Sequence, residues 1–368
     1  MARKWGLRSA WFRALMAVAI VAGPAFAEVT TERPGSIIIW PKIIASGTRD
    51  TIIQISNVSN SMVHAHCFYV NAALEPAPPP QQGLVPKWQE VDFDIWLTKQ
   101  QPTHWVASLG RRIFPLDPEC TTTVDECNDA GLDPGRVPPV PPDFVGELKC
   151  IEVDSSGAPI SGNHLKGEAT LVVLQAGGTN DFGDVSKYSA LAVVGLDTND
   201  ANNVLCLGGG VTSQCVRGAE YNACPQTTLL TNFATHADNP QLGDKSEVLT
   251  EVTIVPCTEN FEAQKPSSVV VQFQVTNEFE ETFSASTTVT CWGNFELSEV
   301  NSVVFDVDTV GSRFLQTRMI PIKDSSGGIL AVAEEFHRLA PITGRAAFNL
   351  YTIGERATAD VITIPEGP

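Results

Sequence analysis

The sequence predicts an all-β fold, arranged as two antiparallel β-sandwich domains after a cleaved signal peptide. Hydrophobic and polar side chains alternate with a period of two along much of the chain, and β-branched and aromatic residues are common there. This pattern is typical of strands that bury one face. Clusters of Asn, Asp, Ser and Gly separate these segments at short intervals, as turns do. Because a sheet with one hydrophobic face must bury it, we expect sheets packed face to face.

Residues 1–27 have the composition of a secretory signal peptide. A hydrophobic run at 14–22 follows basic residues and precedes small residues that a signal peptidase recognises, Ala25 and Ala27. The run is much shorter than the roughly 20 residues that span a membrane. We therefore expect cleavage after Ala27 and export to the periplasm or the extracellular space. No later segment is long and hydrophobic enough to predict a transmembrane anchor in the mature chain.

Alternation is clearest in four segments, which are residues 51–56, 63–70, 269–276 and 283–291. Weaker alternation predicts further strands near 37–44, 91–97, 147–153, 168–175, 188–196, 203–207, 247–257, 301–307, 314–320 and 347–353. Residues 328–339 fit either a short helix or a strand.

The predicted domains are residues 28–180 and 181–368. The boundary lies within a segment rich in Gly, Asn and Asp at 176–183, and a second candidate boundary lies between 233 and 246. Residues 109–145 are rich in proline, which removes the backbone donors that a strand needs. We expect an irregular loop there, clamped by its own disulfide and suited to a contact surface.

Residues 50–72 read DTIIQISNVSNSMVHAHCFYVNA, two strong strand segments around an Asn- and Ser-rich turn. This stretch resembles the paired B and C strands of immunoglobulin-like domains in exported bacterial proteins. The resemblance implies an immunoglobulin-like sandwich and at most a role in placement, and it carries no catalytic residues. Phe68 and Tyr69 stand where antibody domains have a tryptophan.

The chain carries a net charge of −18, and removing the basic signal peptide makes it more negative. Binding to nucleic acid needs clustered Lys and Arg, so the balance argues against nucleic acid and against an anionic membrane surface. We therefore expect the partner to be a protein or a component of the cell surface.

All nine cysteines follow residue 27, and most should pair in an oxidising compartment. No zinc-type spacing is present, and the odd number leaves at least one thiol outside an internal pair. Spacing favours the pairs Cys120–Cys127, Cys215–Cys224, Cys257–Cys291 and Cys67–Cys150, which leave Cys206 over. A Cys206–Cys215 bond with Cys224 free is the alternative.

His64 and His66 form a candidate metal site. Residues i and i+2 of a strand share a face, so both imidazoles would point the same way and suit Cu²⁺ or Zn²⁺. A third ligand is needed, for which His104, Asp92 and Asp94 are candidates. The alternative is that the two histidines simply occupy a half-exposed face.

The sequence also contains candidate sites for two further ligands, Ca²⁺ and a sugar. Asp197, Asn199 and Asp200 lie in an Asn- and Asp-rich segment that offers oxygen ligands for Ca²⁺, although turns use the same residue types. Trp96 and Trp105 are candidates for stacking on a sugar ring, although most tryptophans of a sandwich fill its core.

Catalytic patterns are scarce. The chain has no G-x-S-x-G motif, and its adjacent glutamates would point to opposite faces of a strand. The sequence therefore predicts an exported, non-catalytic structural or interaction module of the bacterial envelope or the extracellular space. A metal- or carbohydrate-binding protein is the alternative, and a secreted hydrolase is third.

Overall fold

The computed structural model describes residues 29–77, 79, 83–111, 134–174, 182–196, 202–209, 214–215, 218–238, 247–322, 327–339 and 342–365. The described chain is almost entirely β-structure, as the sequence predicts, with two four-residue helices, α2 (Leu297–Val300) and α3 (Val307–Val310). The expected signal peptide, residues 1–27, lies outside the described residues.

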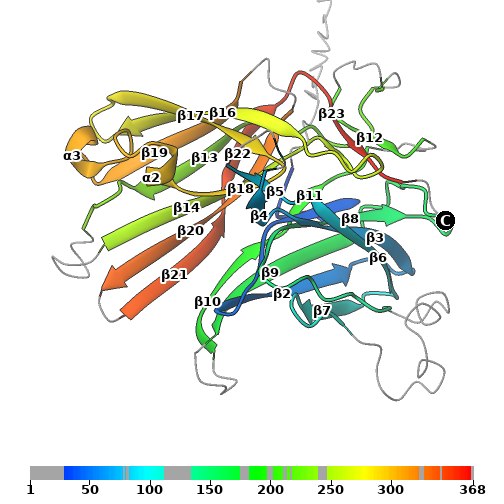
Figure 1. Ribbon diagram of the computed structural model, residues 1–368. Helices are drawn as coiled ribbons and strands as arrows, with labels where there is room; N and C mark the ends of the chain where they lie inside the picture. Colours follow the sequence, from blue (N-terminus) through cyan, green and yellow to red (C-terminus); the bar gives the residue numbers. More distant parts are fainter. Residues whose placement is uncertain are drawn as a thin grey trace, which may run out of the picture.

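Most of the strands up to β11 form two sheets on one side of the molecule (Figure 1). The five-stranded sheet has the order β11-β1-β8-β3-β6 and contains β1 (Ile37–Ala45), β3 (Val63–Asn71), β6 (Gln89–Leu97), β8 (Phe144–Val153) and β11 (Leu191–Val193). The four-stranded sheet has the order β10-β9-β2-β7 and contains β2 (Arg49–Asn57), β7 (Pro102–Val106), β9 (Leu165–Leu174) and β10 (Phe182–Ser189). A separate hairpin joins β4 (Leu74–Pro76) to β5 (Leu84–Pro86).

Most later strands form a second group of sheets (Figure 1). One sheet has the order β17-β16-β19-β13-β22 and contains β13 (Pro225–Phe233), β16 (Ser268–Asn277), β17 (Thr282–Thr290), β19 (Phe314–Pro321) and β22 (Tyr351–Glu355). Another has the order β18-β14-β20-β21 and contains β14 (Glu247–Pro256), β18 (Gly293–Glu296), β20 (Ile329–Leu339) and β21 (Ile342–Asn349). A three-stranded sheet joins β12 (Val204–Leu207), β23 (Asp360–Thr363) and β15 (Glu259–Asn260).

The immunoglobulin-like resemblance is wrong. Residues 50–72 form β2 and β3, which do not pair with each other, because β2 lies between β7 and β9 whereas β3 lies between β6 and β8. The five sheets of three or more strands are arranged in a way that resembles a five-bladed β-propeller, not two immunoglobulin-like sandwich domains. Alternation identified the strands, but it carries no information on which strands become neighbours.

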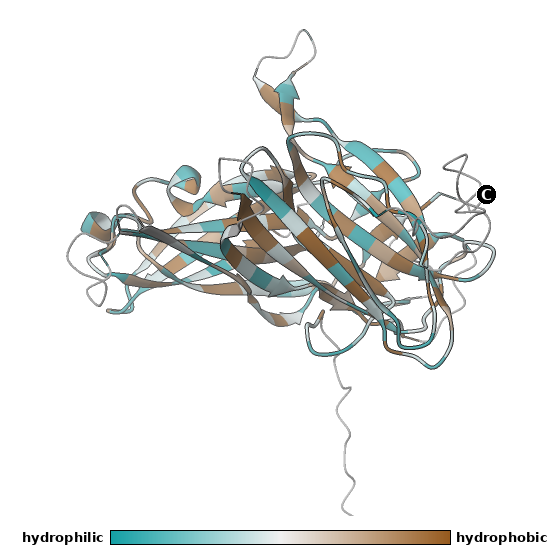
Figure 2. Cartoon of the chain, turned by 90° about the horizontal axis from the view of Figure 1, so that it is seen from below, coloured by the Kyte–Doolittle hydropathy of each residue, from teal (hydrophilic) through white to brown (hydrophobic). Residues whose placement is uncertain are grey.

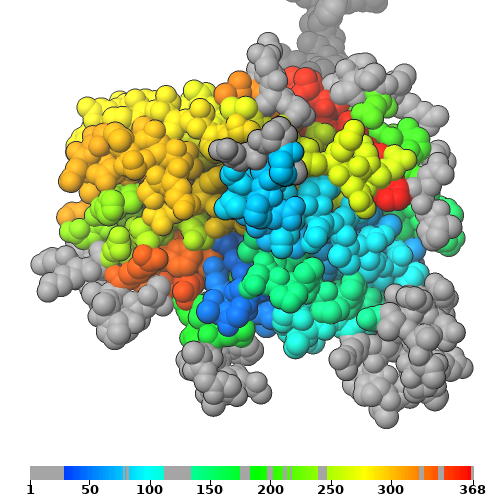
Figure 3. All heavy atoms as spheres, in the orientation of Figure 1, coloured from blue at the N-terminus to red at the C-terminus, as the bar shows by residue number. Residues whose placement is uncertain are grey.

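The described residues form three large hydrophobic cores and a fourth, small cluster around Cys206 and Cys215, and hydrophobic residues are concentrated along the central strands (Figure 2). The first core fills the space between the two early sheets and contains Trp40, Cys67 and Trp105. The third lies between the two larger late sheets and contains Phe273. The second core joins early and late strands through residues such as Phe68, and these parts of the chain are in direct contact in Figure 3.

Strand β3 is buried on both of its faces. Val63, Ala65 and Cys67 enter the first core, whereas Phe68 and Val70 on the other face enter the second. The expectation of one buried face is therefore wrong for β3, which is buried on both sides because it lies between two packed layers.

Two other expectations for local structure need correction or completion. Residues 301–307 form turns and the start of α3 instead of a strand, because Asp306 caps α3 by accepting a hydrogen bond from the backbone of Asp308. Residues 328–339, which fit either a helix or a strand, contain β20.

Sheet pairing continues across the predicted domain boundary. Strand β10 pairs with β9, and β11 pairs with β1, so strands after residue 181 complete both early sheets. The division of the chain into residues 28–180 and 181–368 stays a prediction.

Three disulfides connect the described residues, Cys67–Cys150, Cys206–Cys215 and Cys224–Cys257, whereas Cys291 is a buried free thiol. The first pair confirms the pairing that spacing favours. The expected Cys215–Cys224 and Cys257–Cys291 pairs are wrong. Cys257 is bonded to Cys224 across two sheets, which leaves Cys291 without a disulfide partner among the described residues. Cys120 and Cys127 lie outside the described residues.

Candidate functional site

The most unusual group of side chains is a buried charged cluster, defined as Glu147, Lys149 and Glu259. Glu147 and Lys149 lie two residues apart on β8 and share a face, and Glu259 approaches them from β15. The Lys149 ammonium nitrogen lies 2.5 Å from Glu147 Oε2 and forms a second ion pair with Glu259. All three side chains have an exposed fraction of 0%, although charged side chains are almost never fully buried unless they are paired.

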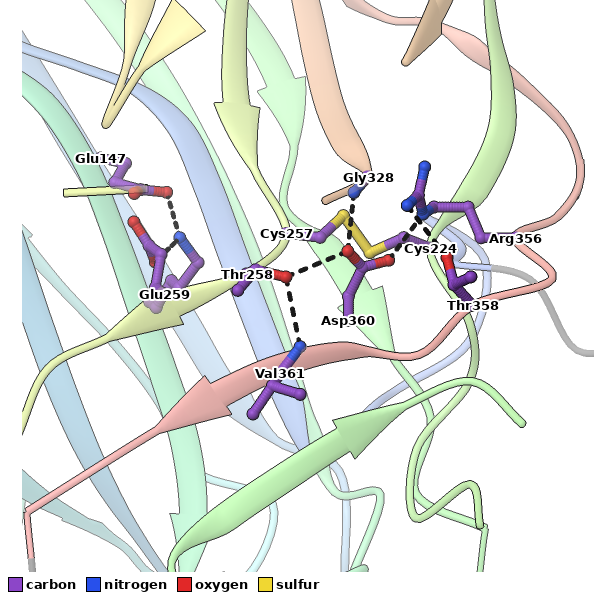
Figure 4. The surroundings of a disulfide bond; sticks show 11 residues. Glu147, Cys224, Cys257, Thr258, Glu259, Gly328, Arg356, Thr358, Asp360 and Val361 are labelled. Atoms are coloured by element: carbon purple, nitrogen blue, oxygen red, sulfur yellow. Dashed lines mark hydrogen bonds and ion pairs between the residues drawn. A yellow bond between two sulfur atoms is a disulfide. The ribbon is translucent and has the colours of Figure 1, made fainter. Parts of the chain in front are cut away.

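Short-range contacts hold Glu259 in place. Cys257, two residues earlier, is bonded to Cys224, and Thr258 donates a hydrogen bond of 3.0 Å to Asp360, the first residue of β23 (Figure 4). Glu259 itself pairs with Ile362 of β23 in parallel register. The backbone that carries this carboxyl group is therefore held by a disulfide, a side-chain hydrogen bond and strand pairing.

Burial and mutual charge control protonation in the buried charged cluster. Burial raises the pKa of Glu259 well above its usual range, and the charge of Glu147 raises it further, whereas Lys149 opposes the shift. Burial by itself would lower the pKa of Lys149, but the two carboxyl groups outweigh burial and the pKa is raised. The cluster thus combines an ammonium group with two carboxyl groups, and the raised pKa of Glu259 favours the protonated form of that group.

Hydrophobic and aromatic groups surround the buried charged cluster. The Lys149 nitrogen lies 6.0 Å from the centre of the Phe261 ring, and that ring stacks on Phe68 at 4.4 Å. Burial, followed by the charges of Glu259 and Glu147, raises the pKa of the nearby Cys291 thiol. Cys291 is therefore a poor thiolate nucleophile here, since reactivity requires the ionised form.

His64 and His66 lie side by side on β3, as the sequence predicts, and each faces a carboxylate of β6. His64 Nε2 lies 2.9 Å from Asp94 Oδ1, and His66 Nε2 lies 3.1 Å from Asp92 Oδ2. The hydrogen bond from His66 is the main cause that lowers the pKa of Asp92. The two aspartates that the sequence suggested as ligands thus come close to the histidines, whereas His104 lies on β7 of the other early sheet.

The fit of this group to a metal ion is incomplete. Each histidine faces a different carboxylate, and the described residues hold a single set of three possible ligand atoms within 4.8 Å of one another, Cys224, Cys257 and Asp360. The two sulfurs of that set are joined in a disulfide. The copper or zinc site at His64 and His66 stays a prediction.

The two tryptophans proposed for sugar binding have different environments. Trp96 is half-buried and stacks on His64, with ring centres 4.5 Å apart. Trp105 is 2% exposed in the first core and donates its indole hydrogen to the Tyr69 hydroxyl at 2.6 Å. Trp105 therefore offers no face to a sugar, because its neighbours on the inner side of the sheet cover it.

A pocket of about 400 Å³ lies on the outer side of the β10-β9-β2-β7 sheet. Gln54, His104 and Glu168 occupy one cross-strand row of that pocket. A second pocket, of about 520 Å³, is lined by residues near Thr30 and by Tyr351. Neither pocket includes the buried charged cluster, so both are separate from it.

The β17-β16-β19-β13-β22 sheet presents a broad outer face with few charges. Its strand register places hydroxyl, amide and hydrophobic side chains in cross-strand rows on the side away from the third core. We call this surface the outer face, and it consists of Thr282, Ser284, Ser286, Thr288, Thr290, Ser268, Val270, Gln272, Gln274, Thr276, Phe314, Gln316, Arg318, Ile320, Thr227, Leu229, Thr231, Phe233, Tyr351, Ile353 and Glu355.

Several predicted features fall outside the described residues. They are the calcium candidates Asp197, Asn199 and Asp200, and most of the proline-rich loop at 109–145, of which 109–111 and 134–145 are described. Within the described part of the chain, neither helix has the length or the hydrophobicity to cross a membrane.

Sequence reasoning missed the buried charged cluster. A usable signal was present, because Glu147 and Lys149 interrupt the otherwise mostly hydrophobic stretch from Phe144 to Ile151. A strand that is buried on both faces must pair such charges. The partner Glu259 gave no signal, since it is distant in sequence. No protein-family model matches this chain, and no curated protein matches it.

Proposed function

We propose that the protein is exported and acts as a non-catalytic structural or interaction module of the bacterial envelope or the extracellular space, with the outer face as its contact surface. The partner is a protein or a component of the cell surface. The composition of the outer face is the observation that carries this proposal.

Charge distribution supports the outer face as an interface. The chain contains 42 acidic residues, yet the outer face has Glu355 as its one acidic member and Arg318 as its one basic member. Depletion of charge and exposure of aromatic side chains distinguish the centres of protein interfaces from other surfaces. Tyr351 is 77% exposed there, beside the exposed side chain of Ile353.

Covalent cross-links support the proposed compartment. Disulfides persist in oxidising environments and are rare in the cytosol, and the described residues contain three of them. They fit the hydrophobic run and the small residues that predict secretion at the N-terminus.

Adding negative charge to the outer face tests the proposal. The variant Gln274→Glu with Gln316→Glu changes two amides to carboxylates of nearly the same shape on adjacent strands. We expect wild-type protein in the exported fraction of its own cells to be cross-linked into a larger complex, and the variant to be recovered uncross-linked. Native electrophoresis after chemical cross-linking measures the difference.

The control adds the same charge elsewhere. Gln89→Glu with Gln100→Glu alters two exposed positions outside this sheet and should leave the complex intact. A wild-type protein that never enters a complex, or a complex that both variants disrupt equally, would contradict the role of the outer face.

A metal-binding role is the second candidate function. The observation in its favour is that His64 and His66 each lie beside a carboxylate on the neighbouring strand, which supplies nitrogen and oxygen ligands on one sheet face.

A further inference from the structure

The buried charged cluster contains the reactants and the proton acceptor for an amide bond between two side chains. Lys149 supplies an amine nitrogen, Glu259 a carboxyl carbon and Glu147 a second carboxyl group in contact with that nitrogen. The three groups come from two segments that are far apart in sequence, and all three side chains are fully buried where they meet. A solvent-borne substrate has no access to them, so their chemistry is with one another.

We propose that Lys149 and Glu259 condense to a covalent isopeptide bond in the folded protein, with Glu147 as the proton-transfer group. The bond ties β8 to β15 and therefore links the early and late parts of the chain.

The reaction balances without an added reagent. Glu147 accepts a proton from the Lys149 ammonium group, and the free amine nitrogen attacks Cδ of the protonated Glu259 carboxyl group. The new Nζ–Cδ bond forms, and the bond from Cδ to the hydroxyl oxygen breaks. The second proton lost from nitrogen passes to that hydroxyl through Glu147, so one water molecule leaves. The products are a neutral amide and a protonated Glu147.

Position favours the forward reaction. Holding an amine against a carboxyl group replaces a collision between two molecules by an intramolecular step, with effective concentrations that reach about 10⁵–10⁸ M. Cys257, Thr258 and the pairing with β23 fix Glu259 at this place (Figure 4). A general base within hydrogen-bond distance of the nitrogen, here Glu147 at 2.5 Å, assists proton removal.

Burial provides the driving force. Before the reaction the interior holds an ammonium group and a carboxylate, whose removal from water is unfavourable. Afterwards every member of the cluster is neutral. The same burial that disfavours these charges also protects the amide from hydrolysis.

The electrophile is Glu259 rather than Glu147, because a protonated carboxyl group accepts an amine whereas a carboxylate repels it. Burial and the charge of Glu147 raise the pKa of Glu259, which favours the protonated form. The raised pKa of Lys149 keeps its resting state charged, which is why a proton acceptor in contact is required.

The intact mass of the purified, folded and then reduced protein tests the proposal. We expect a mass lower than that of the reduced linear chain by one water molecule. Digestion should release a branched peptide that contains both Lys149 and Glu259. A wild-type protein with the full linear mass, or a branch that joins Lys149 to Glu147, would overturn the assignment.

Variants separate chemistry from folding. Glu147→Gln keeps the side-chain volume, and we expect folded protein with the full linear mass; complete cross-linking in this variant would refute the role of Glu147. Glu259→Gln can react by loss of ammonia instead of water and would then give the same cross-linked chain as the wild type, with the same mass. Lys149→Met cannot react, and any loss of water from it would contradict the proposal. Circular dichroism and thermal melting report whether each variant is folded.

The chain also contains an internal control. Lys187 and Glu168 form an ion pair of the same residue types, but their side chains are 50% and 46% exposed. Our proposal requires burial as well as contact for the amide bond to form, so Lys187 and Glu168 should be recovered in linear peptides from the same digest. A branch at this exposed pair would show that burial is not required and would overturn the stated mechanism.

Discussion

Two carboxyl groups of β6 near His66, those of Glu90 and Asp92, have shifted pKa values. The sequence correctly placed His64 and His66 on one face, because that relationship depends only on the period of a strand. It also suggested Asp92 and Asp94 as neighbours, and the β3–β6 register brings them there. It could not predict that each histidine would face a separate carboxylate, since this depends on the exact register between two strands.

Glu90 on β6 provides a test at this scale. Burial, with the nearby charge of Asp92, raises its pKa from 4.5 to about 7. The folded protein therefore holds this proton more tightly than the unfolded chain, so the contribution of Glu90 to stability falls as the pH rises from about 4.5 to 7. A glutamine at this position does not ionise, so the Glu90→Gln variant does not lose stability in this way. We expect its free energy of unfolding to be higher than that of the wild type at pH 8 and nearly the same at pH 4.

Urea unfolding of both proteins at the two pH values measures this effect. Glu75→Gln, at an exposed position of β4, removes the same charge and should have little effect at either pH. A Glu90→Gln protein that is less stable than the wild type at pH 8 would show that the carboxylate is favourable in the folded state.

At the scale of elements, alternation predicted strands well where inward side chains are hydrophobic, as in β16. It missed β13, because Thr228 and Asn232 point inward from that strand and break the hydrophobic pattern. Asn232 is tolerated inside because it accepts a hydrogen bond from Thr317 of the neighbouring β19 at 2.8 Å. The residue that satisfies Asn232 lies in a distant part of the chain, so the sequence around Asn232 gives no sign of it.

Gly146 tests the packing of β8 against β3. A Cβ atom at this position would lie 1.9 Å from the Val70 carbonyl oxygen, so the strands would have to move apart. We expect Gly146→Ala to lower the free energy of unfolding by about 1–3 kcal/mol, the usual range for overpacking. Gly47→Ala is the matched control, since a Cβ there meets nothing within 4 Å. Equal urea midpoints for the two variants would contradict this packing argument.

Across the whole molecule, a second buried ionic network joins early and late sheets. A bulge in β1 between Trp40 and Ile43 contains Lys42, whose ammonium group lies 2.9 Å from both Glu251 and Glu334. Arg49 of β2 also binds Glu334, at 2.6 Å. The local sequence pattern could not reveal such pairs, because their members are distant in sequence. The propeller-like arrangement of the sheets also depends on contacts between distant segments, so the pattern predicted all-β structure but not this arrangement.

Removing the charge of Glu334 tests this connection. Glu334→Gln leaves Arg49 without its carboxylate and Lys42 with Glu251 alone, both near the buried junction. We expect the free energy of unfolding to fall by about 3–5 kcal/mol, as for other broken buried ion pairs. Glu168→Gln, which breaks the exposed pair with Lys187, should change it by about 1 kcal/mol or less. Chemical denaturation measures both, and equal losses would mean that burial does not determine the strength of these contacts.

The Cys67–Cys150 disulfide has a mechanical consequence. Its two residues lie directly opposite each other on β3 and β8 and are separated by 83 positions in sequence. If the chain ends are pulled apart, tension crosses from one strand to the other through the sulfur atoms. The intervening polypeptide, including β6 and β7, then contributes no length to the stretched chain. A protein anchored at one end and pulled at the other would extend less under force than its number of residues suggests.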